Sequence, residues 1–348
     1  MDVYDLGTVP WRLSQTYYHA LAYLRRPGLI LLQPGSPYVC LGYHQDARVE
    51  LDLDYVNQQA IPLFRREVGG GAVYLDRGQL FYQFVFDKED PRLPASKDAF
   101  YRKFLEPVVA TFRDFGLPAE FKPVNDILVG GRKISGNGAA EIGESVVLVG
   151  NFMLDFNYDQ MARVLRVPDE KFRDKVHKSL AENLTTMKRE LREPPTLQEL
   201  SKRLLENSAP LVGGWTPAEI DSEIKQKAEE IWESHSQPQW TFFNDARRRD
   251  GREIKIAEGV SIVQKVVKLP GGLVRVTATN KSGSLYDIHL SGDFFIYPQE
   301  AVVELEHTLE GTEYRADRLT AVIEDFFERR QVEAPGLAPN ELAEAFLP

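Results

Sequence analysis

The stretch Arg65-Arg66-Glu67-Val68-Gly69-Gly70-Gly71-Ala72-Val73 decides how this 348-residue sequence is interpreted. Two arginines are followed, after two residues, by three consecutive glycines. Because glycine lacks a Cβ atom, the backbone N–H groups of such a loop can approach an anion closely, and a nearby guanidinium can bind phosphate oxygens in a bidentate manner. The run is not a Walker loop, since no Gly-Lys-Ser/Thr follows, and it lacks the G-x-G-x-x-G spacing of dinucleotide-binding proteins. It indicates an anion-binding loop, with a solvated surface loop as the alternative on these residues alone.

A second motif runs from Asn125-Asp126-Ile127 through Gly130-Gly131 to Arg132-Lys133-Ile134-Ser135-Gly136. Two glycines between two short apolar runs are typical of a two-residue β-hairpin. Lys133 then lies on the return strand, where it is held more rigidly than on a loop. It can act there as a fixed positive charge for a phosphate or a developing oxyanion. Taken by itself, the same residue also fits an ordinary exposed strand lysine.

The pattern outside these motifs predicts an α+β chain. Residues 29–32 and 38–41 are two apolar runs separated by a Pro- and Gly-rich turn, which predicts a strand pair. Large apolar residues recur at helical spacing over residues 100–115 and end at Gly116, a typical helix C-cap. Residues 159–233 are predominantly helical in pattern.

The pattern changes after residues 234–240, which we interpret as a linker. Beyond it, three alternating runs joined by tight turns predict a strand meander, and two amphipathic helices follow, over residues 300–309 and 316–330. The length agrees with two domains. We therefore predict a larger domain over residues 1–240 and a small α+β domain over residues 241–348.

Composition excludes several classes of protein. The chain has 52 acidic against 42 basic residues and a formal charge of −10, whereas a general nucleic-acid binder usually carries the opposite balance. Cys40 is the single cysteine, so neither a disulfide framework nor a multi-cysteine zinc site can form within the chain. The six histidines show no metal-ligand spacing along the sequence, so no metal site is predicted from them. No apolar run reaches the ~20 residues of a membrane span, and the first residues do not resemble a signal peptide, so we expect a cytoplasmic protein.

Together, the two motifs resemble one family. Arg65-Arg66-x-x-Gly-Gly-Gly-x-Val, the following Asp-x-Gly, then Asn-Asp-Ile and Gly-x-Lys-Ile-Ser-Gly are similar to the lipoate–protein ligases of the biotin/lipoate ligase superfamily. The resemblance continues through residues 167–184, similar to the family's lysine-containing segment that folds over the adenylate. It also reaches Leu290-Ser291-Gly292-Asp293-Phe294-Phe295, similar to the small C-terminal accessory domain. It implies a catalytic domain with a mixed or antiparallel sheet and flanking helices, followed by that accessory domain.

The resemblance implies a two-step reaction with ATP, Mg²⁺ and lipoate. The lipoate carboxylate attacks the α-phosphate of ATP, which releases pyrophosphate, and a lysine of a small lipoyl-type acceptor domain then attacks the lipoyl-adenylate, which releases AMP. Lys133 is the implied catalytic residue, and Asp126 is the candidate protein contact to Mg²⁺. The residues implied to bind ATP or the adenylate are Arg66, Gly71, Ala72, Val73, Tyr74, Gln79, Asp126 and Lys175. Those implied to bind lipoate are Arg65, Gly69, Gly70, Lys133 and Gly136.

The sequence also departs from the family pattern. Leu75-Asp76-Arg77-Gly78-Gln79 stands where the family usually has His-Asp-x-Gly-Asn, and Asn137-Gly138-Ala139-Ala140 follows Ser135-Gly136 in place of the usual Ser-Ala-Gln or Ser-Ala-Tyr. Two other functions therefore stay open. One is an octanoyl- or lipoyl-transferase that works through a thioester, for which Cys40 is the one candidate thiol. The other is a paralogue that binds nucleotide or a lipoyl domain without turnover.

Overall fold

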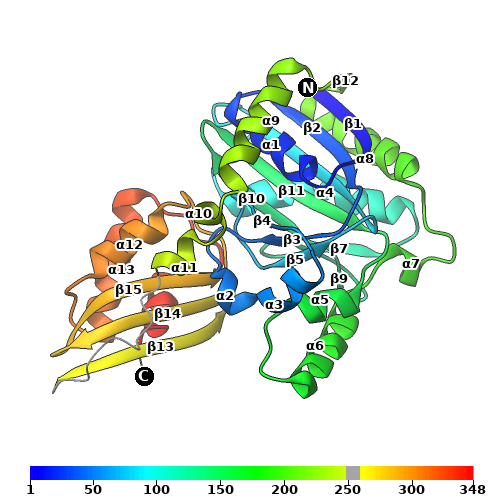
Figure 1. Cartoon of the computed structure of the whole chain (residues 1–348). Helices are drawn as coiled ribbons and strands as arrows, with labels where there is room; N and C mark the ends of the chain where they lie inside the picture. Colours follow the sequence, from blue (N-terminus) through cyan, green and yellow to red (C-terminus); the bar gives the residue numbers. More distant parts are fainter. Residues whose placement is uncertain (248–258, 348) are drawn as a thin grey trace.

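The larger part of the molecule is built on a six-stranded mixed sheet. The computed structural model describes residues 1–247 and 259–347. The sheet has the strand order β10-β11-β6-β2-β1-β12, in which β1 pairs parallel with β2 and β12 and the other neighbours pair antiparallel (Figure 1). Both faces of the interior strand β6 are covered, since the first eight residues of this strand are buried. The strands are β1 (Asp2–Val9), β2 (Gly28–Pro34), β6 (Gln79–Asp87), β10 (Asn137–Ile142), β11 (Ser145–Met153) and β12 (Thr216–Pro217).

Helices pack on this sheet and supply its core. Helix α1 lies against β2, β6 and β11, and α9 packs beside it (Figure 1). Helix α4 packs against α8, and its Phe100 and Phe104 rings contact Phe86 of the sheet. Gly116 follows α4 with φ +83°, so the predicted helix with its glycine C-cap is confirmed. These helices are α1 (Leu13–Tyr23), α4 (Lys97–Asp114), α8 (Leu197–Val212) and α9 (Ser222–His235).

Two small three-stranded sheets carry the two sequence motifs. The first has the order β4-β3-β5 and the second β7-β8-β9. The predicted pairing of residues 29–32 with 38–41 is wrong, because β2 pairs with β1 and β6 whereas β3 pairs with β4 and β5. The proline-bounded turn at residues 34–37 thus passes the chain from one sheet to another. The strands are β3 (Tyr38–Leu41), β4 (Leu63–Arg65), β5 (Val73–Leu75), β7 (Ala119–Lys122), β8 (Asp126–Val129) and β9 (Arg132–Ser135).

Short helices surround these sheets. Helix α6 has no buried residue and projects from the body of the molecule (Figure 1). The stretch 234–240, interpreted from sequence as a linker, instead contains the end of α9 and the start of α10. It is packed, since Trp240 Nε1 donates to Arg65 O at 2.8 Å. These helices are α2 (Ala47–Glu50), α3 (Leu53–Gln58), α5 (Tyr158–Val164), α6 (Glu170–Asn183), α7 (Met187–Glu190), α10 (Pro238–Thr241) and α11 (Phe243–Arg247).

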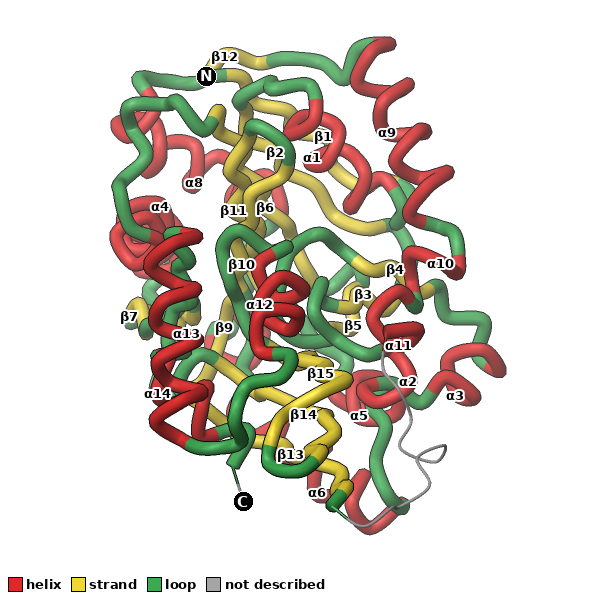
Figure 2. Tube along the Cα trace, turned by 90° about the vertical axis from the view of Figure 1, so that its left-hand side faces the viewer, coloured by secondary structure: helices red, strands yellow, loops and turns green. Residues whose placement is uncertain are grey.

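The C-terminal part has its own hydrophobic core. Three antiparallel strands form the predicted meander, and the alternating burial along β14 shows that one face packs inward. Helix α12 packs on β15, and α13 lies beside α14 (Figure 2). None of the described helices is long and apolar enough to cross a membrane. The elements are β13 (Val260–Leu269), β14 (Gly272–Lys281), β15 (Ser284–Asp293), α12 (Ala301–Leu309), α13 (Ala316–Arg330) and α14 (Pro339–Glu344).

Candidate active site

A cavity of about 460 Å³ lies where the glycine loop, the β8–β9 hairpin and the C-terminal meander meet. One part of its wall is apolar, with side chains such as Val68, Phe81, Val149 and Phe295. Cationic side chains face the same space. The predicted site residues that line it are Arg66, Gly69, Gly70, Gly71, Ala72, Val73, Asp126, Lys133 and Gly136. The fold therefore brings the two sequence motifs together around one cavity.

Arg66 is fixed by the loop that follows it. Its Nη2 donates to Gly69 O at 2.7 Å and to Gly71 O at 2.9 Å, and Nη1 donates to Cys40 O at 3.3 Å. Gly70 has φ +85°, a conformation that favours glycine. The guanidinium is thus held in place before any ligand arrives, and it presents its charge to the cavity.

Lys133 lies on the return strand of the predicted hairpin, which is confirmed. Gly130 and Gly131 form the turn with φ +56° and +76°, and β8 and β9 pair on either side. Lys133 Nζ lies 2.6 Å from Asp126 Oδ1, and both side chains are about one-third exposed (34% and 28%). The Lys133 carbonyl accepts a hydrogen bond of 2.8 Å from Thr185 N, just after α6. The strand and the pairing carboxylate therefore position this ammonium group at the cavity.

The C-terminal part closes one side of the cavity. Lys268, Asp293 and Phe295 line it, and Gly70 N donates to Phe294 O at 3.0 Å. A Cβ atom at Gly69 would lie 2.5 Å from the backbone oxygen of Phe294, so the close approach of the two parts requires glycine there. The glycine loop is therefore also the surface that the C-terminal part contacts.

The structure does not bring four predicted site residues to the cavity wall. Arg65 is fully buried and donates to four backbone carbonyls, those of residues 42, 43, 45 and 241. Tyr74 is buried in the core cluster beside β3. Gln79 donates to Tyr74 O at 3.2 Å and accepts from Asn151 Nδ2 at 2.6 Å. Lys175 lies on α6 with Nζ above the Phe172 ring.

Several cavity residues were missed by sequence reasoning. Gln15 and Tyr18 come from α1, and Lys268 comes from the meander, so no local motif marks them. Asn137 had a weak signal, because it stands in a segment that departs from the family pattern. Asn151 Oδ1 accepts from Gly136 N at 2.9 Å, and Asn137 Nδ2 donates to Asn125 O at 2.9 Å. These amides hold the segment after Lys133 in place.

Cys40 lines the cavity but is fully buried on β3. Burial raises the pKa of its thiol, although the Arg66 guanidinium, 3.7 Å from Sγ, acts in the opposite direction. A thiol with a raised pKa carries little thiolate at neutral pH and is a poor nucleophile. The sulfur therefore behaves here as a small apolar wall group.

Two family models cover most of the chain. Residues 7–209 match the lipoyl protein ligase A/B catalytic domain, and residues 262–346 match the bacterial lipoate protein ligase C-terminus. A lipoate-protein ligase, LplJ, of Bacillus subtilis is 28% identical over 85% of this chain and 84% of its own length. An octanoyltransferase, LipM, of Kyrpidia tusciae is 23% identical over 62% of this chain and 87% of its own length.

Solved structures of lipoate protein ligases are also similar to this chain. A structure from Thermoplasma acidophilum, described as a bipartite lipoate protein ligase and its E2 lipoyl domain, has a TM-score of 0.63 and 27% identity, covering 72% of this chain and 98% of that one. Lipoate-protein ligase A bound with ATP has a TM-score of 0.58 at 25% identity, over 69% and 98% of the chains. The T. acidophilum protein Ta0514 with bound lipoic acid has the same score and identity, over 70% and 98%. The α+β fold, the cavity between its two motifs and the match over more than half of its length together place this chain in the lipoyl protein ligase A/B catalytic domain family.

Proposed function

We propose that the protein is an ATP-dependent lipoate–protein ligase, with residues 1–240 as catalytic domain and residues 241–348 as accessory domain. The observation that carries this proposal is the cavity itself, whose wall combines Lys133 and Arg66 with apolar side chains. A carboxylic acid with an aliphatic chain needs this combination of a fixed cation and an apolar wall. The relatives bound with ATP and with lipoic acid support both substrates.

In the first step, the lipoate carboxylate attacks the α-phosphate and pyrophosphate leaves. Negative charge develops on the phosphate oxygens, and a preorganised cation stabilises that charge more than it stabilises the separated substrates. Lys133 supplies this cation, and Arg66 with the glycine-loop amides holds the nucleotide. In the second step, the ε-amine of an acceptor lysine attacks the lipoyl carbonyl, and AMP leaves with the bond electrons of the mixed anhydride.

Mg²⁺ fits the residues that are present. Asp126 and Asp293 both line the cavity, and Mg²⁺ is commonly held by one or two carboxylates together with substrate phosphates. The ion, when bound with ATP, would neutralise phosphate charge. Asp126 would then exchange its contact with Lys133 for one with the nucleotide complex.

The acceptor is proposed to be a lipoyl-type domain, which is supported by the T. acidophilum ligase studied with its E2 lipoyl domain. Helix α6 is free of buried residues, and the chain just after it is joined to β9 through Thr185 and Lys133. We assign Lys175 of this helix as a contact to the adenylate that forms when α6 moves toward the cavity. Such a contact would shield the mixed anhydride from water until the acceptor arrives.

The test is direct detection of the acyl-adenylate. The protein is incubated with ATP, Mg²⁺ and either lipoate or fatty acids of graded length, and the product is identified by mass. We expect lipoyl-adenylate, together with lipoate-dependent exchange of pyrophosphate into ATP. Exchange should be lost in Lys133→Ala and retained in Lys202→Ala, a control lysine with a 79% exposed side chain. Tight ligand binding without adenylate, pyrophosphate or AMP would instead identify a paralogue that binds without turnover.

A thioester-based acyltransferase is the second candidate, because LipM is a relative and Cys40 lines the cavity. Transfer of an acyl group from an acyl-loaded carrier domain in the absence of ATP would favour it.

A further inference from the structure

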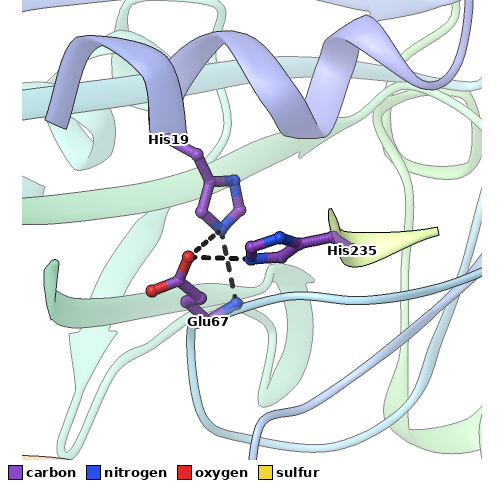
Figure 3. A group of neighbouring side chains, drawn as sticks. All are labelled: His19, Glu67 and His235. Atoms are coloured by element: carbon purple, nitrogen blue, oxygen red, sulfur yellow. Dashed lines mark hydrogen bonds and ion pairs between the residues drawn. The ribbon is translucent and has the colours of Figure 1, made fainter. Parts of the chain in front are cut away.

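Three buried side chains outside the cavity point toward one another from distant parts of the chain. They are His19 on α1, Glu67 just before the glycine loop, and His235 at the end of α9 (Figure 3). Glu67 Oε1 lies 2.9 Å from His235 Nε2 and 3.9 Å from His19 Nε2, and the three atoms all lie within 4.8 Å of one another. Each side chain is at least nine-tenths buried. A convergence of two imidazoles and a carboxylate inside the protein requires a chemical explanation.

The outer hydrogen bonds determine which ring nitrogens face the centre. His19 Nδ1 lies 2.6 Å from Gln15 O, and a carbonyl oxygen can only accept, so Nδ1 carries the proton and Nε2 has a lone pair. The Ser234 hydroxyl donates to Ile231 O at 2.9 Å, so its oxygen, 2.8 Å from His235 Nδ1, accepts from that ring. Both rings therefore use Nδ1 for an outer hydrogen bond and direct Nε2 inward, toward Glu67.

The carboxylate is oriented in the same way. Tyr23 Oη lies 3.0 and 2.9 Å from the two oxygens of Glu67 and donates to the carboxylate. The Glu67 peptide N–H donates to His19 Nε2 at 3.4 Å, a long hydrogen bond that a bound metal ion would replace. The ion-pair partners of Glu67 are the two histidines. Glu67 Oε1 and the two Nε2 atoms thus face one point, and a positive charge is needed there, supplied either by a ring proton donated to Glu67 or by a bound cation.

We propose that His19, Glu67 and His235 bind a divalent transition-metal ion of the Zn²⁺ class. Two imidazole nitrogens and one carboxylate oxygen are ligands that Zn²⁺ accepts, and a three-residue set leaves a fourth position for water. Imidazole ligands disfavour Mg²⁺ and Ca²⁺, which take oxygen ligands. Hydrogen bonds from the second ring nitrogen to Gln15 O and Ser234 Oγ match the outer contacts that orient metal-bound histidines.

The ion would tie together three segments that meet beside the cavity. Glu67 directly follows Arg66, and the His235 ring packs on Trp240, whose indole donates to Arg65 O. Metal binding would therefore stabilise the base of the glycine loop against α1 and the end of α9. The site lies outside the proposed ligase chemistry, so its test does not depend on the ligase activity.

The test is metal content and affinity of the tag-free full chain. Wild-type protein grown with added Zn²⁺ and dialysed should retain one equivalent by elemental analysis. After chelator treatment, it should take up Co²⁺ with the visible absorption of a low-coordinate site. Zn²⁺ affinity, measured by competition with a chromophoric chelator, should fall about 10–100-fold in Ser234→Ala and further in Glu67→Gln, which keeps the shape of the side chain. The matched control is His307→Ala, which removes an exposed histidine and should bind as wild type does.

Two results would overturn the proposal. The first is a wild-type protein that, after metal loading and dialysis, retains no stoichiometric Zn²⁺ and takes up no Co²⁺. The second is Glu67→Gln protein with unchanged affinity, because the metal would then be bound elsewhere. If Glu67→Gln does not fold, Ser234→Ala and the wild-type content still decide, since neither measurement depends on that variant.

Discussion

Lys133 Nζ and Asp126 Oδ1 face each other across the β8–β9 hairpin at 2.6 Å. Because both side chains are about one-third exposed, this ion pair adds little to the free energy of unfolding. The pair instead determines where the Lys133 ammonium group lies. Asp126 holds the ammonium at the cavity, and under the proposed function it would release that partner when an anionic substrate binds. The pair therefore links substrate binding to the placement of the proposed catalytic cation.

Asp126→Asn should slow adenylate formation less than Lys133→Ala. Removing Lys133 takes away a preorganised charge, for which about a 10²–10³-fold loss is typical. The asparagine can still accept a hydrogen bond from the ammonium, so it keeps the orientation and loses only the charge. Pyrophosphate exchange at saturating lipoate measures both variants. Asp325→Asn, which breaks an exposed pair with Arg329, serves as the control. Equal losses in the two cavity variants would show that Asp126 acts directly on the reacting groups.

His44 should make the protein less stable in acid. Burial, followed by the nearby Arg247 and Arg65, lowers the pKa of His44 from 6.5 to about 3. As pH falls below 6.5, the unfolded chain binds a proton at this residue and the folded protein does not, so the free energy of unfolding decreases until about pH 3. This group contributes about 1.4 kcal/mol per pH unit in that window.

His44→Phe isolates that contribution. The replacement ring can keep the stacked contact that His44 makes with Phe294, at 4.9 Å between centroids. Denaturant unfolding at pH 7 and pH 5 should give a smaller difference in this variant than in wild type. His307→Phe at an exposed position should leave the difference unchanged. If the free energy of unfolding of His44→Phe falls with pH as steeply as that of wild type, other groups cause the loss of stability in acid.

Cys40→Ala should retain ligation of lipoate to an acceptor lysine. Burial raises the pKa of the Cys40 thiol, and its side chain is inaccessible, so the native protein should also resist alkylation by iodoacetamide. Labelling followed by mass measurement checks the second expectation, with denatured protein as the positive control. Loss of acyl transfer in Cys40→Ala, with adenylate formation intact, would instead indicate a thioester route.

The elements that sequence predicted best are those fixed by local physical chemistry. The Gly130-Gly131 hairpin, the amphipathic helix before Gly116 and the C-terminal meander follow from turn residues and apolar periodicity. The partner of β3 could not be predicted in this way. Residues 29–32 and 38–41 have the pattern of a hairpin, but their pairing is decided by strands far along the chain.

The candidate active site shows the same difference between residues that a local motif identifies and residues that only the folded chain brings together. Lys133, Arg66 and the glycines lie within two short motifs and were identified from them. Lys268 and Asp293 reach the cavity only through docking of the C-terminal part. His19, Glu67 and His235 are separated by 48 and 168 residues, so no spacing rule could join them.

Arg65 and Arg66 show most clearly that neighbouring residues of one motif can have different roles. The side chains of adjacent residues in an extended chain point to opposite sides. Arg65→Met removes a buried guanidinium that satisfies four carbonyl oxygens and lies 3.8 Å from Asp245, so it should lower the free energy of unfolding by about 3–5 kcal/mol. Arg66→Met should cost less stability and should raise the KM for ATP, because its guanidinium faces the cavity. Urea unfolding and adenylate kinetics on both variants measure the contrast. If Arg65→Met unfolds at the wild-type midpoint but fails to bind ATP, then Arg65 belongs to the nucleotide site, and the assignment of structural and binding roles within the pair is reversed.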